Sequence, residues 1–179
     1  MMPCPVTSTQ APCRRRYQRY GASMERLVVV GTPQLLPGRV DRTNWPVHVT
    51  VLPNFVVDGA AVAAVTSIVR EAAQLQSAFG VDLGPRAMFG PRRDIPVLLA
   101  EHPVFHALHG SLSGSVEPLS GFRPDHVEFW GTRYRPHAAI VPGAQSAGAR
   151  QISITNLAVA SLAGPQARVL VNCQLAALS

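Results

Sequence analysis

Runs of apolar and β-branched residues, separated by proline, glycine and polar turn residues, recur along the chain from about residue 24 onward. Runs of this length between turn residues are typical of buried strands. The pattern predicts strands at residues 27–32, 47–55, 81–89, 95–99, 127–130, 134–141, 152–157 and 169–173. Extended chain therefore makes up most of the predicted structure.

Two segments have the features of helices instead. Apolar residues repeat at helical spacing across residues 59–78, which follow Asp58 as a candidate N-cap. A second helix is expected from Pro103 to Gly110 or Gly114. Along the chain, two predicted strands precede the first helix and two more precede the second. Mostly strands follow the second helix. This order indicates an α+β class and argues against a parallel Rossmann sheet.

Two of the predicted strands carry a histidine behind a proline. In the first, the alternation of a strand places His48 and Thr50 on one face, with Val49 and Val51 on the other. In the second, the same alternation groups three residues on one face: Arg135, His137 and Ala139. Imidazole gains and loses a proton near neutral pH, so two such strands suggest a two-histidine acid/base site.

The composition limits the class of protein. The chain has 179 residues and 47% apolar content, which is enough for one domain with a real core. It has no apolar run of about 18 residues, so no membrane partner is expected. The formal charge of +6 favours anionic partners such as phosphates or nucleic acid.

The cysteines and the first residues bear on location and domain limits. Cys4, Cys13 and Cys173 are odd in number and lack paired spacing, which favours a reducing, cytoplasmic location. Residues 1–23 carry an arginine cluster without the apolar core of a secretory signal. We expect them to be a disordered or non-native tail; a transit peptide or a nucleic-acid arm is the alternative. One domain is expected over residues 24–179.

The motifs resemble those of a known family. His48-Val49-Thr50 resembles the H-x-T motif of the two-histidine (2H) phosphoesterases, which include 2′-5′ RNA ligase-like proteins and 2′,3′-cyclic nucleotide phosphodiesterases. Residues 87–91, Ala-Met-Phe-Gly-Pro, resemble the family's strand ending in Phe-Gly, and residues 135–137, Arg-Pro-His, resemble the lead into its second motif. The resemblance implies a bilobal α+β fold, with two antiparallel sheets in pseudo-twofold symmetry around a central cleft and helices outside.

The resemblance also implies roles for individual residues. Opening a cyclic phosphodiester needs a base for water, an acid for the leaving oxygen and hydrogen-bond donors to the phosphate. His48 and His137 would form the acid/base pair, in an order that stays open, and Thr50 would donate to the phosphate. No cofactor and no metal are expected. The predicted substrate contacts are Arg135, Ala139, Tyr134 and Trp45.

One position departs from the family pattern. The second motif has Ala139 where the family has threonine or serine, so Thr50 alone supplies a motif hydroxyl. Loss of one hydrogen bond to a charged group costs about 1.5–3 kcal/mol, which would slow an enzyme without abolishing it. Arg135, Ser153 and Thr155 are candidates to compensate. The alternative is a lineage that binds its ligand and no longer cleaves it.

Four further histidines are candidates for other roles. His102, His106 and His109 lie on one face of the predicted second helix, as a metal triad would, but the opposite face is apolar, so we expect all three to be solvated. His126 lies in a segment that vaguely resembles the motif and is the alternative partner of His48.

Three functions therefore stay open. The first is a metal-independent phosphodiesterase that opens 2′,3′-cyclic phosphates on RNA ends or small cyclic nucleotides. The second is a weakened relative that binds RNA ends or nucleotides. The third is a phosphodiesterase that degrades cyclic oligonucleotide signals. We expect a monomer, because the two lobes of one chain would already form the cleft.

Overall fold

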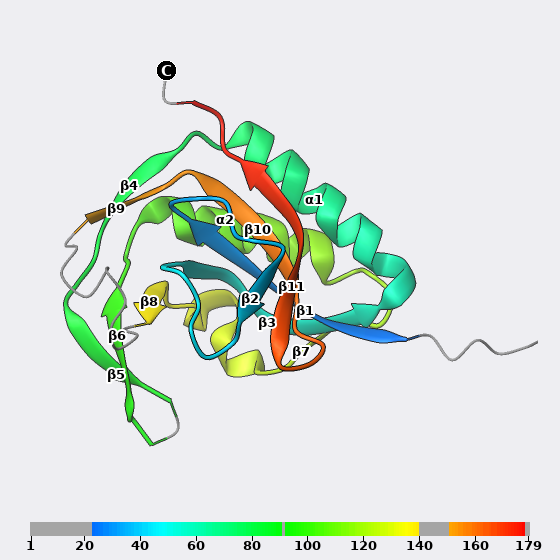
Figure 1. The fold of residues 1–179 in the computed structure, drawn as a ribbon, viewed down its shortest axis with the longest axis horizontal. Coiled ribbons are helices and arrows are strands. Elements are labelled where there is room, and N and C mark those ends of the chain that lie inside the picture. The colour runs from blue at the N-terminus through cyan, green and yellow to red at the C-terminus, as the bar shows by residue number, and fades with distance from the viewer. Residues whose placement is uncertain (1–22, 91, 140–150, 178–179) are drawn as a thin grey trace, which may run out of the picture.

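The computed structural model describes residues 23–90, 92–139 and 151–177 (Figure 1). The predicted tail, residues 1–23, lies outside them except for Ser23. The elements in chain order are β1 (Met24–Thr32), β2 (Arg39–Asp41), β3 (Val49–Asp58), η1 (Gly59–Ala61), α1 (Val62–Leu75), β4 (Phe79–Asp82), β5 (Arg86–Phe89), β6 (Ile95–Leu99), α2 (Pro103–Val116), β7 (Arg123–Pro124), η2 (Val127–Phe129), η3 (Gly131–Arg133), β8 (His137–Ala139), β9 (Gln151–Ile154), β10 (Asn156–Ser161) and β11 (Gln166–Gln174).

The largest sheet is antiparallel, with the strand order β2-β11-β10-β1-β3-β7. Its strand β1 pairs with β10 on one side and β3 on the other. Successive side chains of a strand point to opposite faces. Leu27 and Val29 therefore join the larger core on one face, whereas Val28 and Val30 join a smaller core on the other.

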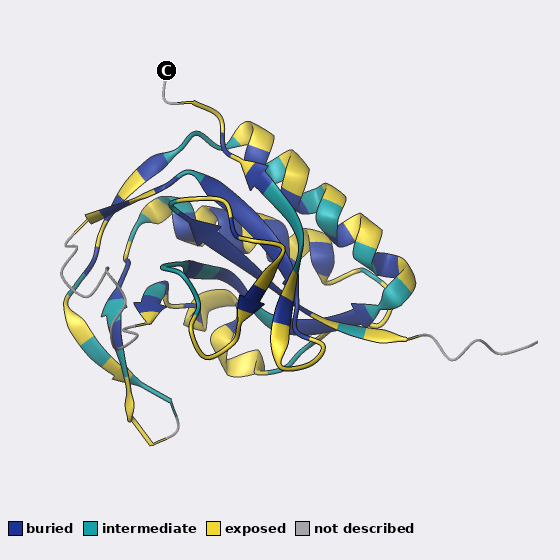
Figure 2. Cartoon of the chain, viewed as in Figure 1, coloured by how far each residue is buried: buried dark blue, intermediate teal, exposed yellow. Residues whose placement is uncertain are grey.

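Different elements cover the two faces of this sheet. Helix α1 packs on β10, β11 and α2, while α2 packs on β3, so both helices cover the larger core (Figure 1). The chain around β2 covers the opposite face, where Leu36 and Val40 are buried and Trp45 packs on the smaller core. Figure 2 shows the resulting buried strands between exposed outer surfaces. Within the described ranges, no helix combines the length and apolar character needed to cross a membrane.

The other described strands form two smaller antiparallel sheets. Strand β4 pairs with β9, and β6 pairs with both β5 and β8. Strand β8 also contacts β3 of the large sheet. This contact brings the second histidine segment beside the first. The predicted α+β class, with antiparallel sheets and helices packed outside, is confirmed, although the described strands form three sheets rather than two.

Three local predictions are wrong. Residues 127–130 form 3₁₀ turns rather than a strand, closed by Phe129 N–H donating to the His126 carbonyl, and Val127 is exposed. The predicted strand 81–89 is two strands, because Pro85 lacks the N–H that a continuous ladder needs. Asp58 does not cap the first helix; its carboxylate accepts a hydrogen bond from Ser120.

Candidate active site

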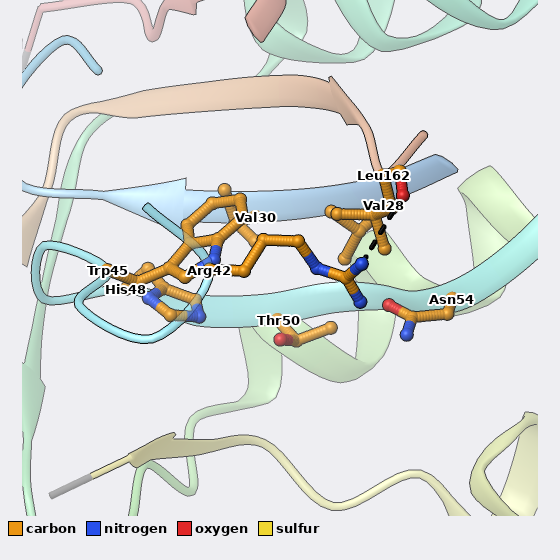
Figure 3. Close-up of a pocket in the computed structure, with 8 residues that line it drawn as sticks. All are labelled: Val28, Val30, Arg42, Trp45, His48, Thr50, Asn54 and Leu162. Carbon is orange, nitrogen blue, oxygen red and sulfur yellow. Dashed lines mark hydrogen bonds between the residues drawn. The ribbon is translucent and has the colours of Figure 1, made fainter. Parts of the chain in front are cut away.

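The first histidine segment lies at the start of β3. Val49 and Val51 are fully buried in the larger core, while His48 and Thr50 are half-buried and line a pocket on the opposite face of the sheet. Thr50 shares this face with Val30, its partner across the ladder. The predicted alternation of this segment is thus confirmed. Figure 3 shows His48 and Thr50 among the side chains that line the pocket.

A backbone hydrogen bond fixes the tautomer of His48. Its Nδ1 lies 2.8 Å from the carbonyl oxygen of Pro46, which only accepts hydrogen bonds, so Nδ1 carries the proton. In the neutral ring the lone pair is then on Nε2, the atom a general base uses. Burial lowers the pKa of His48, the hydrogen bond to Pro46 opposes this shift, and the charge of His137 lowers the pKa further.

The second segment repeats this arrangement in β8. His137 Nδ1 lies 2.8 Å from the carbonyl oxygen of Arg135, again two residues earlier in the chain. Burial lowers the pKa of His137; the carbonyl of Arg135 opposes the shift, and the guanidinium of Arg135 lowers the pKa further. Pro136 and Ala138 are buried, whereas Arg135 and Ala139 are exposed and His137 is half-buried, which confirms the predicted alternation.

The two histidines lie on adjoining strands. His137 is not among the residues that line the pocket, but β8 contacts β3, and the charge of His137 lowers the pKa of His48. Phe89, at the end of β5, packs against the His137 ring with 4.5 Å between ring centroids. The Arg135 guanidinium carbon lies 5.4 Å from the centroid of the same Phe89 ring. The Phe89 ring therefore contacts both His137 and Arg135.

The pocket on the His48 side is also lined by Trp45, Arg42 and Asn54, of which only Trp45 was predicted from the sequence. Trp45, a predicted substrate contact, packs against His48 with ring centroids 5.0 Å apart. Asn54 was detectable as a third polar residue of this predicted strand, on the same face as His48 and Thr50 by alternation. Arg42 lies in the loop before β3, where no local pattern indicates which surface it meets.

Tyr134, a predicted substrate contact, lies in the protein core. It is buried, its ring stacks on His109 at 4.0 Å and 3°, and its hydroxyl donates to the Thr50 carbonyl at 2.7 Å. Burial raises the pKa of Tyr134, so the phenol stays protonated and able to donate. Tyr134 thereby ties the backbone of the first motif to the chain that leads into the second.

His109 corrects the prediction of three solvated histidines. It is buried; its Nδ1 donates to the Val51 carbonyl at 2.8 Å and its Nε2 accepts from the Gly131 N–H at 3.0 Å. Burial lowers the pKa of His109, which favours the neutral ring that both bonds require. His109 lies four residues after Phe105 and three before Leu112, so it belongs to the same buried face of α2, which packs against β3. The prediction failed because it assigned His109 to the face opposite this apolar stripe.

The other histidines have separate places. His102 is the N-cap of α2 and accepts from Val104 N–H at 3.3 Å. His106 is exposed and lies 3.1 Å from Glu101. His126, the alternative partner of His48, is also exposed and lies 3.2 Å from Glu128. In the part of the chain that the structure describes, no group of three or more potential ligands is arranged to hold a metal ion.

Neither predicted replacement hydroxyl neighbours Ala139. Strand β8 pairs with β6, where Ala139 lies opposite Val97. Ser153 lies in β9, which pairs with β4, and the Thr155 hydroxyl donates to the Pro33 carbonyl at 2.8 Å. In the described ladders, neither Ser153 nor Thr155 therefore lies on a strand paired with β8.

A family comparison covers nearly all of this arrangement. Residues 19–172 match the model of the 2′-5′ RNA ligase superfamily. The chain belongs to this superfamily. The matched span includes both histidine segments, the Phe89 strand and every helix described above, so the resemblance inferred from the motifs is confirmed. A comparison with curated proteins found no match.

Solved structures show the same fold at low sequence identity. A phosphoesterase matches with a TM-score of 0.56 and 13% identity, covering 86% of this chain and 99% of that one. The protein TT0787 of Thermus thermophilus matches with a TM-score of 0.55 and 16% identity, covering 86% and 100%. Escherichia coli LigT complexed with 3′-AMP matches with a TM-score of 0.52 and 15% identity, covering 86% and 99%. At these sequence identities, the similarity to the solved structures shows a shared fold.

Loss of the Tyr134 hydroxyl tests the link between the two segments. Tyr134→Phe keeps the ring stack but leaves the Thr50 carbonyl without its side-chain donor, so we expect the free energy of unfolding to fall by about 1 kcal/mol. Urea denaturation measures the change. Thr66→Val is the control, since it removes an exposed helical hydroxyl and should change stability by less than about 0.5 kcal/mol. Equal stability of Tyr134→Phe and the wild-type protein would contradict the link.

Proposed function

We propose that this protein is a metal-independent phosphodiesterase that opens 2′,3′-cyclic phosphates on RNA ends or small cyclic nucleotides. The observation that carries the proposal is the matched pair of histidines. Each donates Nδ1–H to the carbonyl two residues before it, and each therefore offers Nε2 for chemistry. A phosphate between adjoining strands β3 and β8 would meet one Nε2 from each side, with the Thr50 hydroxyl as a donor.

The reaction needs the two rings in opposite protonation states. The neutral histidine takes a proton from water while the water oxygen bonds to phosphorus. The bond from phosphorus to one ribose oxygen breaks, and the protonated histidine gives that oxygen its proton. Water and the cyclic phosphate become a phosphomonoester with a free hydroxyl. The two histidines end with their protonation states exchanged, so a proton exchange with solvent restores the starting enzyme.

The surroundings of the histidines support a nucleotide substrate. Trp45 offers an aromatic face beside His48, and such faces stack on bases. Arg135, held above the Phe89 ring, places an exposed guanidinium beside His137, where it is suited to a phosphate oxygen. Structures of Escherichia coli LigT hold 3′-AMP, phosphate and ATP, which agrees with nucleotide binding by this fold.

A second candidate function rests on Ala139. The residue is exposed on the His137 face of β8 and carries a methyl group where the family pattern has a hydroxyl. A protein with this change would keep the histidines, Thr50 and the aromatic contacts while stabilising the transition state less. The alternative is therefore a protein that binds RNA ends or nucleotides and cleaves them slowly or not at all.

Removal of either histidine tests the proposed chemistry. In EDTA, His48→Ala and His137→Ala should each reduce kcat by about 100-fold or more on a panel of 2′,3′-cyclic mononucleotides, cyclic-phosphate-ended RNA and cyclic oligonucleotides. His126→Ala is the matched control, because His126 is exposed and bonds Glu128, and it should keep wild-type turnover. Loss in His126→Ala with retention in His137→Ala would mean that the partner is misassigned. Absence of wild-type turnover on every substrate would contradict the proposed activity.

The lowered pKa values predict an acidic optimum. Both imidazoles have a pKa below the ordinary histidine value near 6.5, mainly through burial, so both are neutral in the free protein at pH 7. The form with one protonated ring becomes more populated as the pH falls and declines once both rings are protonated. We expect kcat/KM to follow a bell with its maximum below about pH 6.5. A rate that rises steadily above about pH 7 would contradict the assignment.

A restored hydroxyl distinguishes a slow enzyme from a binder. Ala139→Thr should raise kcat/KM about tenfold if the hydroxyl stabilises the transition state, because that factor corresponds to about 1.4 kcal/mol. Ala139→Val is the matched control, since it adds the same volume without a donor. Nucleotide binding without turnover in both the wild-type protein and Ala139→Thr would favour the binding function.

A further inference from the structure

We propose that Arg42 and Asn54 form a second phosphate subsite in the pocket beside His48, which takes the 5′-phosphate of the nucleotide that ends in the cyclic phosphate. The inference rests on the proposed function and narrows its substrate class. It favours RNA ends and 5′-phosphorylated nucleotides over cyclic mononucleotides that lack a 5′-phosphate.

The position of Arg42 separates it from the reacting phosphate. Figure 3 shows its side chain extending over Val30, with the guanidinium toward Asn54 and away from His48 and Trp45. Asn54 lies four residues after Thr50 along β3, and a strand advances about 3.3 Å per residue. An anion held by Arg42 and Asn54 would therefore lie along the strand from one held by His48 and Thr50.

The guanidinium is held in place and keeps donors free for a ligand. Its Nη1 donates to the carbonyl oxygens of Gly164 at 3.1 Å and Leu162 at 3.4 Å. The ion pairs among the described residues do not include Arg42. A guanidinium has five N–H groups, and those on Nε and Nη2 make no hydrogen bond to the residues that the structure describes, so they can form a bidentate contact with phosphate.

The loop that carries Arg42 is also fixed. The Asp41 carboxylate accepts hydrogen bonds from the Thr43 N–H and hydroxyl, both at 2.8 Å, and Asn44 N–H donates to the Asp41 carbonyl. The Asp41 carboxylate is thus engaged with the turn rather than with the neighbouring arginine. Arg42 is exposed, and its hydrogen bonds to the Leu162 and Gly164 carbonyls orient the guanidinium before any ligand arrives, which limits the entropy lost on binding.

Chemistry identifies the second anion. A 2′,3′-cyclic phosphate lies at the 3′ end of an RNA strand, so the next phosphate along the chain is the 5′-phosphate of that same nucleotide. With the cyclic phosphate at the histidines and the base beside Trp45, this 5′-phosphate is the next anionic group that the substrate presents. Arg42 is the cation that the same pocket provides for it.

The kinetic test compares 2′,3′-cyclic AMP with and without a 5′-phosphate. For the wild-type protein we expect a higher kcat/KM with the 5′-phosphate, and in Arg42→Met the ratio of the two values should fall about tenfold. Methionine keeps an apolar stem over Val30 and removes the charge. Arg39→Met is the matched control: it removes an exposed arginine from β2, outside the pocket, and should keep the ratio. Equal ratios in wild type and Arg42→Met, or no wild-type preference, would overturn the subsite.

A binding test does not depend on turnover. The chain has two tryptophans; Trp45 lines the pocket and Trp130 is buried in the core, so fluorescence changes on binding report mainly on Trp45. Adenosine 3′,5′-bisphosphate should bind more tightly than 3′-AMP, and Arg42→Met should reduce the difference about tenfold. That result without turnover of any substrate would support the subsite and contradict the proposed activity. The same difference in Arg42→Met and wild type would overturn the subsite whether or not the protein is active.

Discussion

Burial of β1 on both faces is the constraint on which the rest of the fold depends. Leu27 and Val29 need the cover that α1 and α2 provide, and Val28 and Val30 need cover from the chain around β2. The sheet is therefore a middle layer with a helical side and a loop side. The pocket forms on the loop side, where β3 presents His48 and Thr50 beside Val30. The helices stabilise the site from behind without entering it.

The two histidine segments are held together by groups that do not face the pocket. His109 binds the Val51 carbonyl and the Gly131 N–H, and Tyr134 stacks on His109 and donates to the Thr50 carbonyl. These four contacts join α2, β3 and the chain before β8. An enzyme that uses one acid and one base needs their separation fixed to within a fraction of an ångström. Buried hydrogen bonds to backbone provide that control better than exposed side chains do.

Ala139 and Arg42 both bear on how a phosphate-containing ligand would be bound, but they lie on different segments. The alanine removes a donor near His137, whereas Arg42 lies beyond Thr50 on the other segment. Binding energy from a remote phosphate is useful to an enzyme only if it is used to position the reacting group. In the proposed enzyme, a contact between Arg42 and a remote phosphate would offset part of the transition-state stabilisation that the missing motif hydroxyl no longer supplies.

The sequence alone determined the features that depend on local periodicity. Strand alternation predicted that His48 and Thr50 share one face with Val49 and Val51 on the other, and it grouped Arg135, His137 and Ala139 on one face, as the burial of these residues confirms. The α+β class followed from the order of strands and helices. These predictions hold because the two faces of a strand are fixed by its backbone, whatever the strand packs against.

Tertiary structure decided what depends on partners distant in the chain. The buried face of α2 packs on β3, where the Val51 carbonyl accepts a hydrogen bond from His109, and Tyr134, stacked on His109, donates to the Thr50 carbonyl. Arg42 entered the pocket because the turn between β10 and β11 supplied carbonyls for its guanidinium. The local sequence pattern does not predict the contacts of Tyr134 with Thr50 or of Arg42 with the β10–β11 turn, because they form only when separate elements pack against one another.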